Sequence, residues 1–174
     1  MTSADSHVSH AGPDSELTLT VDGQLARLDV DPGSRLVDVL RTQLGALAPK
    51  VGCGTGDCGA CTVLRDDEPV KSCLELALNN AGSRITTTAG LAAADGTLHP
   101  VQRAFWDAFG FQCGFCLSGM LLVAVDLIAR TPEPSDEDIR EAIAGNLCRC
   151  TGYEDIVSAV RLAATRMHEG DQDG

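Results

Sequence analysis

Cysteines are the residues of this 174-residue chain best suited to hold a metal, and they fall into two sets of four. The first set comprises Cys53, Cys58, Cys61 and Cys73, and the second comprises Cys113, Cys116, Cys148 and Cys150. Thiolates bind zinc and iron, and four of them complete a tetrahedral or iron–sulfur site. The grouping therefore predicts two separate metal sites.

The first set has the spacing of an iron–sulfur site. Four residues separate Cys53 from Cys58 and two separate Cys58 from Cys61, as in the ligand run of plant-type [2Fe–2S] proteins. Apart from Asp57, the residues between these cysteines are glycine or small. A cluster with four thiolates is negatively charged, so its burial needs backbone N–H groups close to sulfur, and glycine removes the side chains that would block them. We predict a [2Fe–2S] cluster here.

Zinc and disulfide bonds are the alternatives. Structural zinc sites usually combine two short Cys-x2–4-Cys pairs, unlike the single glycine-rich run of the first set. The spacing of the second set alone fits either metal, and the first set favours iron. Cys148 and Cys150 cannot share one face of a regular helix, and a disulfide between them would be strained. We therefore expect irregular backbone between Gly145 and Gly152.

The composition indicates a globular protein. Hydrophobic residues make up 44% and charged residues 22%, and the formal net charge is −12. This acidity disfavours nucleic acid and anionic membrane surfaces as partners, and no apolar run is long enough for a membrane span. Residues 1–16 lack lysine, arginine and an apolar segment, so no export signal is predicted and we expect a cytoplasmic protein with reduced thiols. Residues 1–15 and 169–174 are expected to be disordered tails.

Residues 16–90 predict a small α+β domain. Alternating apolar residues on both sides of Asp22-Gly23 predict a first hairpin, and residues 62–64 and 69–70 predict a second. Ser34 is expected to cap a short helix, and Gly45 is expected to end it. Residues 84–87 form a further short strand, and the small residues 88–96 are expected to be a linker.

Residues 91–168 predict an all-α domain of four helices, so the whole chain is assigned to the α+β class. The first helix begins at His99-Pro100 and buries a periodic apolar face, formed by Val101, Ala104, Phe105, Ala108 and Phe109. The others span residues 117–129, 135–144 and 155–167. Each cysteine pair of the second set precedes a helix.

The remaining residues give weaker signals. Trp106 lies off the apolar face of its helix and is a candidate for an interface. Arg149, between two cysteines, either tunes the charge of a cluster or forms a surface ion pair. The sequence contains no catalytic Ser/His/Asp or Cys/His set, no phosphate loop and no dinucleotide-binding motif, so no catalytic residue is predicted.

These motifs together resemble the iron–sulfur subunit of the molybdenum hydroxylases, the family of xanthine dehydrogenase, aldehyde oxidoreductase and carbon monoxide dehydrogenase. The resemblance runs from residue 16 to 167 and rests on GCGTGDCGACTV at 52–63, KSCLELA at 71–77, HPVQRAFWDAFGFQCGFC at 99–116 and GNLCRCTGY at 145–153. It implies a ferredoxin-like β-grasp domain followed by a four-helix domain, each binding one [2Fe–2S] cluster through its four cysteines.

The resemblance also implies two partners: a large subunit with a molybdenum–pterin cofactor and a medium subunit with FAD, assembled as a dimer of heterotrimers. Electrons would pass from molybdenum through the helical-domain cluster and the ferredoxin-like cluster to FAD, with Gln112 and Cys150 near the pterin. One departure is visible: Leu117-Ser118 stands where the family commonly has Thr-Pro. A free-standing two-cluster ferredoxin and a zinc-stabilised interaction module are the alternatives. The substrate is not indicated.

Overall fold

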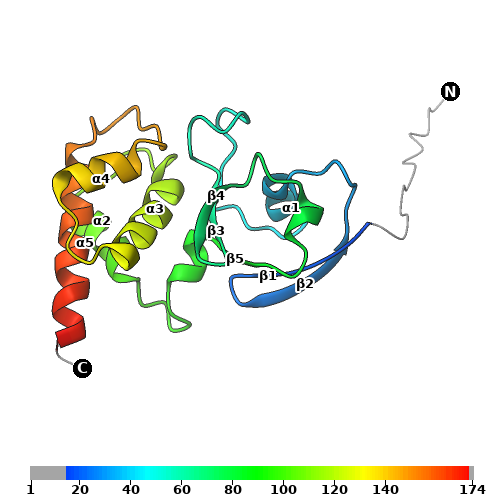
Figure 1. Ribbon diagram of the computed structural model, residues 1–174, viewed down its shortest axis with the longest axis horizontal. Coiled ribbons are helices and arrows are strands. Elements are labelled where there is room, and N and C mark those ends of the chain that lie inside the picture. The colour runs from blue at the N-terminus through cyan, green and yellow to red at the C-terminus, as the bar shows by residue number, and fades with distance from the viewer. Residues whose placement is uncertain (1–14, 173–174) are drawn as a thin grey trace.

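The computed structural model describes residues 15–172, which form an α+β fold. Its strands are β1 (Glu16–Val21), β2 (Gln24–Asp29), β3 (Thr62–Arg65), β4 (Glu68–Lys71) and β5 (Arg84–Thr86). Its α-helices are α1 (Leu36–Thr42), α2 (Pro100–Asp107), α3 (Leu117–Arg130), α4 (Asp136–Ile143) and α5 (Glu154–Gln172). The sheet and α1 lie at one end of the molecule and the helices α2–α5 at the other, with α3 beside the sheet (Figure 1).

The sheet is mixed, with strand order β2-β1-β5-β3-β4. Both predicted hairpins are present, and β5 joins them by pairing parallel with β1 and antiparallel with β3. Asp22-Gly23 turns the first hairpin with positive φ at both residues, and Asp66-Asp67 turns the second in the same way, which suits the right-handed twist of the strands. Alternate residues of β1 point into a core that α1 covers, formed by Leu17, Leu19, Val21, Leu36, Val39 and Leu40.

Some residues that the sequence analysis assigned to the two tails belong to the folded structure. Ser15, assigned to the N-terminal tail, is buried, and its carbonyl accepts a hydrogen bond from Val30 N–H at 2.9 Å. Helix α5 continues to Gln172, beyond the expected boundary at residue 168. The remaining tail positions, 1–14 and 173–174, lie outside the described residues. Within the described part, no helix is both long and apolar enough to cross a membrane.

The helices of the second half begin close to the predicted positions. His99 caps α2, accepting from Val101 N–H through Nδ1 at 3.2 Å, and Gln102 accepts from His99 N–H. The prediction that Phe109 belongs to the buried face of this helix is wrong. The helix ends at Asp107, Phe109 adopts a φ of 52°, and its side chain is 78% exposed. The expected linker also has local structure, a 3₁₀ turn at Thr88–Leu91.

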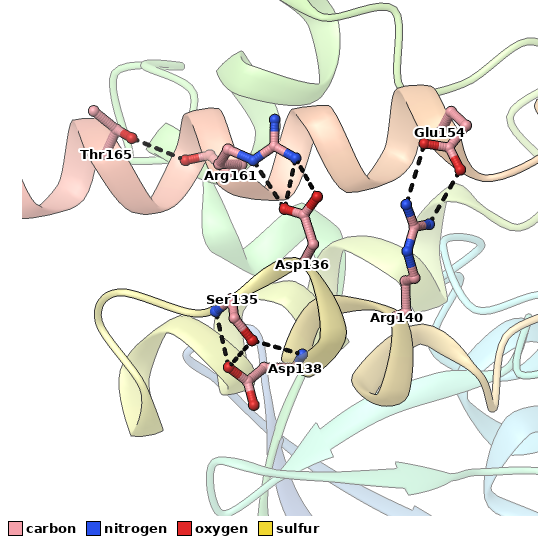
Figure 2. Close-up of polar contacts among 7 residues, drawn as sticks. All are labelled: Ser135, Asp136, Asp138, Arg140, Glu154, Arg161 and Thr165. Carbon is pink, nitrogen blue, oxygen red and sulfur yellow. Dashed lines mark hydrogen bonds and ion pairs between the residues drawn. The ribbon is translucent and has the colours of Figure 1, made fainter.

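Helices α4 and α5 are tied together by ion pairs, shown in Figure 2. Ser135 caps α4 by accepting from Asp138 N–H, as predicted. Arg161 of α5 forms a bidentate pair with Asp136, with its Nη2 at 2.5 Å and 2.6 Å from the two carboxylate oxygens. Arg140 of α4 pairs with Glu154, the first residue of α5, at 3.2 Å. The loop between these helices carries two cysteines, and the Arg140–Glu154 pair joins the last turn of α4 to the first residue of α5 across it.

Candidate metal centres

The cysteines of the first set lie around one end of the sheet. Cys53 and Cys58 belong to the loop between α1 and β3, Cys61 directly precedes β3, and Cys73 follows β4. Cys61 and Cys73 are buried and pack together against Val37 of α1. Folding therefore brings Cys73, the remote fourth cysteine of this set, against Cys61.

Backbone N–H groups surround the sulfur atoms of this loop. Cys53 Sγ accepts from Thr55 N–H at 3.3 Å and from Cys58 N–H at 3.4 Å, and Cys58 Sγ accepts from Cys53 N–H at 3.4 Å. Position 52 favours glycine, because a Cβ there would lie 2.8 Å from Cys58 Sγ and one of the two would have to shift. The loop thus has the two features that a buried, negatively charged cluster needs. Backbone N–H groups donate to sulfur, and glycine stands where a side chain would block the approach.

The thiols of this set differ in acidity. The side chain of Thr55, followed by the backbone N–H groups of Thr55 and Cys58, lowers the pKa of the exposed Cys53 to about 6. Burial raises the pKa of Cys73, and the neighbouring Cys61 raises it further. The loop therefore favours the thiolate at its exposed rim.

The second set gathers where two helices begin. Cys113 and Cys116 immediately precede α3, and Cys148 and Cys150 lie in irregular backbone before α5, as predicted. Cys113 Sγ and Cys150 Sγ are 3.6 Å apart. Cys116 is buried, which raises its pKa to about 12, with the neighbouring Cys148 as the next cause. Residues from two distant segments therefore meet at one place.

Within each set the sulfurs lie in close pairs. All eight cysteines are free thiols. In residues 15–172 no three His, Cys, Asp or Glu side chains gather closely enough to hold a single metal ion. Instead, contacts between thiol side chains join Cys53 with Cys58, Cys61 with Cys73, Cys113 with Cys150, and Cys116 with Cys148. Two thiolate pairs per site match a [2Fe–2S] cluster, in which each of two irons takes two cysteines.

Gln112 and Thr151 are polar neighbours of the second set. Gln112 Nε2 donates to the carbonyl of Cys150 at 3.2 Å, so these two residues lie side by side on an exposed edge. Thr151 Oγ1 contacts Cys148 Sγ at 3.2 Å. Arg149 is exposed and forms no ion pair with any described residue.

Sequence reasoning missed the residues that join the two centres. The Ser118 hydroxyl donates to Ala60 O at 3.2 Å and is buried. Ser118 is part of the departure from the common family motif, and its role here is to fasten α3 to the loop of the first set. Leu147 N–H donates to Cys58 O at 2.9 Å. No local sequence signal indicates these contacts, because their partners are distant in the chain.

Comparison with known proteins agrees with this geometry. The chain matches the family described as 2Fe-2S iron-sulfur cluster binding domain over residues 19–89 and that described as [2Fe-2S] binding domain over residues 87–161. The nicotinate dehydrogenase small FeS subunit of Eubacterium barkeri is 43% identical over 150 residues, which cover 86% of this chain and 95% of that protein. The nicotine 6-hydroxylase small subunit of Paenarthrobacter nicotinovorans is 44% identical over 145 residues, which cover 83% of this chain and 87% of that protein.

Solved structures show the same relationship. Quinoline 2-oxidoreductase from Pseudomonas putida 86 has a TM-score of 0.84 and 39% identity, covering 89% of this chain and 96% of that chain. The aldehyde oxidoreductase from Desulfovibrio desulfuricans has a TM-score of 0.84 and 42% identity, covering 89% of this chain but 17% of that longer one. This chain therefore belongs to the iron–sulfur subunit family of the molybdenum hydroxylases.

Proposed function

We propose that this chain carries electrons from a molybdenum–pterin cofactor on one partner subunit to FAD on another, through two [2Fe–2S] clusters. The observation that carries the proposal is the pairing of cysteine sulfurs in both sets, with backbone N–H groups that donate to the sulfurs of Cys53 and Cys58 in the first. A bound [2Fe–2S] cluster supplies reversible one-electron storage. The protein's part is to hold the clusters, bury them and set the distance between them.

The proposed ligands follow from the pairs of sulfurs. In the first set, Cys53 and Cys58 would hold one iron, and Cys61 and Cys73 the other. In the second set, the proposed pairs are Cys113 with Cys150 and Cys116 with Cys148. We also propose that the two sets belong to two domains, a ferredoxin-like domain at residues 16–90 and a four-helix domain at residues 91–168.

The exposed edge formed by Gln112 and Cys150 is the proposed contact with the molybdenum–pterin cofactor. The hydrogen bond between their side chain and backbone supports a shared role. The edge is open to a partner, since both residues are exposed. Electrons would enter the chain here, and substrate turnover would take place in the partner.

Two partner subunits are proposed because the relatives are parts of larger enzymes. The relative from Eubacterium barkeri is named as the small FeS subunit of a nicotinate dehydrogenase, and the matched region is only 17% of the aldehyde oxidoreductase chain from Desulfovibrio desulfuricans. We propose a molybdenum-binding large subunit and an FAD-binding medium subunit, assembled as a dimer of heterotrimers.

Purification from the native source tests this function, with iron, sulfide, molybdenum and flavin assayed together. We expect the chain to copurify with two larger chains and to contain iron and sulfide in the amounts of two [2Fe–2S] clusters. Two clusters without molybdenum or flavin would instead favour a free-standing ferredoxin. Zinc without iron in anaerobic preparations would refute the cluster assignment.

A further inference from the structure

Arg35 immediately precedes α1 and lies beside the segment that follows Cys73. Leu36 N–H donates to the carbonyl of Glu75 at 2.8 Å, which joins the start of the helix to this segment. Val37, the next residue of the helix, is buried and packs against Cys73. The backbone of Arg35 is therefore held close to the buried sulfurs of the first set.

The guanidinium of Arg35 lies between a carboxylate and the loop of the first set. Arg35 Nε donates to Asp38 Oδ2 at 2.7 Å, and Nη2 donates to Oδ1 at 3.3 Å. The third nitrogen, Nη1, faces the loop, since a Cβ at Gly54 would lie 3.4 Å from it. Because the carboxylate occupies the Nε–Nη2 edge, the ion pair turns its positive side toward the loop that carries Cys53 and Cys58.

The charges of the first set interact with this guanidinium. The bond to Asp38 is the main cause that raises the pKa of Arg35, and negative charge on Cys73 and Cys61 raises it further. The attraction is mutual, so the guanidinium in turn favours negative charge at these sulfurs.

Stability alone gives little reason for an ion pair at this position. The side chains of Arg35 and Asp38 are 41% and 43% exposed, and exposed ion pairs contribute little to stability. Reduction of a [2Fe–2S] cluster, however, adds negative charge to its site, in a chain whose formal net charge is already −12. A cation beside the site stabilises the reduced cluster more than the oxidised one.

We propose that Arg35 raises the reduction potential of the first-set cluster, with Asp38 as the residue that orients it. The inference rests on the proposed function, in which one electron leaves the second-set cluster and enters the first-set cluster, so that one is oxidised as the other is reduced. Arg35 favours transfer in this direction because it stabilises the reduced first-set cluster. No bond is formed or broken in this step.

A redox titration followed by electron paramagnetic resonance tests the proposal in the full chain with both clusters. We expect Arg35→Gln to lower the midpoint potential of the first-set cluster and to leave that of the second-set cluster unchanged. Less than half of the first-set cluster would then be reduced at the wild-type midpoint. An unchanged first-set potential would overturn the proposal, as would an equal shift of both clusters.

Two further variants separate charge from structure. Arg27→Gln removes the same charge from β2, at the opposite edge of the sheet from β4, and should match wild type because salt screens distant exposed charges. Arg35→Lys keeps the charge without the two-nitrogen contact and should restore most of the first-set potential. A potential as low in Arg35→Lys as in Arg35→Gln would show that charge is not the cause and would overturn the proposal.

Asp38→Asn decides the question if Arg35→Gln does not assemble the first-set cluster. This variant keeps the guanidinium and removes the carboxylate that offsets part of its field, so we expect a higher first-set potential. An unchanged or lower first-set potential would overturn the proposal. Absence of both clusters from the wild type would instead refute the proposed function itself.

Discussion

At the scale of single residues, the cysteines divide into two groups that can be lost independently. Cys150 contacts Cys113 and belongs to the second set alone. We expect Cys150→Ser to abolish the electron paramagnetic resonance signal of the second-set cluster and to leave the first-set signal unchanged. Cys53→Ser is the matched variant, with the reverse result expected. Loss of both signals in either variant, in a chain that keeps its helical content, would contradict the division into two sets.

Gly52 tests the need for close backbone approach in the first set. A Cβ at this position would lie 2.8 Å from Cys58 Sγ. We expect Gly52→Ala to lose the first-set cluster, which would halve the iron content. Gly33→Ala is the control, because its Cβ would meet only a side-chain oxygen of Asp31 at 3.2 Å. Equal iron in the two variants would show that the loop can adjust.

At the scale of elements, the ion pairs between α4 and α5 should make the second half sensitive to acid. Arg161 lowers the pKa of Asp136. A carboxylate whose pKa is lowered in the folded state stabilises that state above its unfolded pKa of about 4, and this contribution is lost as the pH falls through the folded pKa. We expect Asp136→Asn to be less stable than wild type at pH 7 and to lose less stability on acidification.

Thermal unfolding followed by circular dichroism between pH 7 and pH 3 measures this difference. Asp155→Asn is the control, since Asp155 is exposed in the first turn of α5 and forms no ion pair with the described residues. An Asp136→Asn curve that parallels wild type across this range would show that the pair is not coupled to stability.

The elements were largely predictable because their signals are local. The Asp22-Gly23 turn, the Ser135 cap and the apolar periodicity of α3 each lie within a few residues of the structure they specify. The prediction for Phe109 was wrong because the apolar periodicity continues past Asp107. The helix ends at Asp107, and the backbone adopts a positive φ at Phe109. The grouping of cysteines followed from spacing, but their pairing did not, since it depends on how distant loops fold together.

The contacts that join the two cysteine sets were the least predictable feature, because they too depend on how distant segments fold together. Leu147 N–H and Cys58 O are ordinary backbone groups, and nothing in their residue types indicates that they meet. Gly59 and Gly119 look like a loop glycine and a helix glycine until the space around them is known. Contacts of this kind come from the packing of α3 against β3 and β4, which no short motif specifies.

At the scale of the whole molecule, an exposed aromatic surface beside the second set suggests where the large partner binds. Trp106 is 61% exposed, Phe109 is 78% exposed, and the Trp106 ring lies 6.0 Å from that of Phe111. Together with Asp107 these three residues line a pocket of about 380 Å³. Phe111 adjoins Gln112, so the surface continues into the edge proposed to face the molybdenum–pterin cofactor. We therefore predict that the proposed molybdenum-binding subunit would bind this surface.

Trp106→Ser tests this assignment. Aromatic side chains that fill partner pockets often contribute about 2 kcal/mol to binding, so we expect Kd for the molybdenum-binding subunit to rise roughly 30-fold. Leu25→Ser is the matched control, because Leu25 is 64% exposed on β2, in the other half of the chain. Both variants should retain both clusters, since neither residue adjoins a cysteine in the sequence. Wild-type affinity in Trp106→Ser would mean that the partner covers another face, and weaker binding in Leu25→Ser would place that face on the sheet.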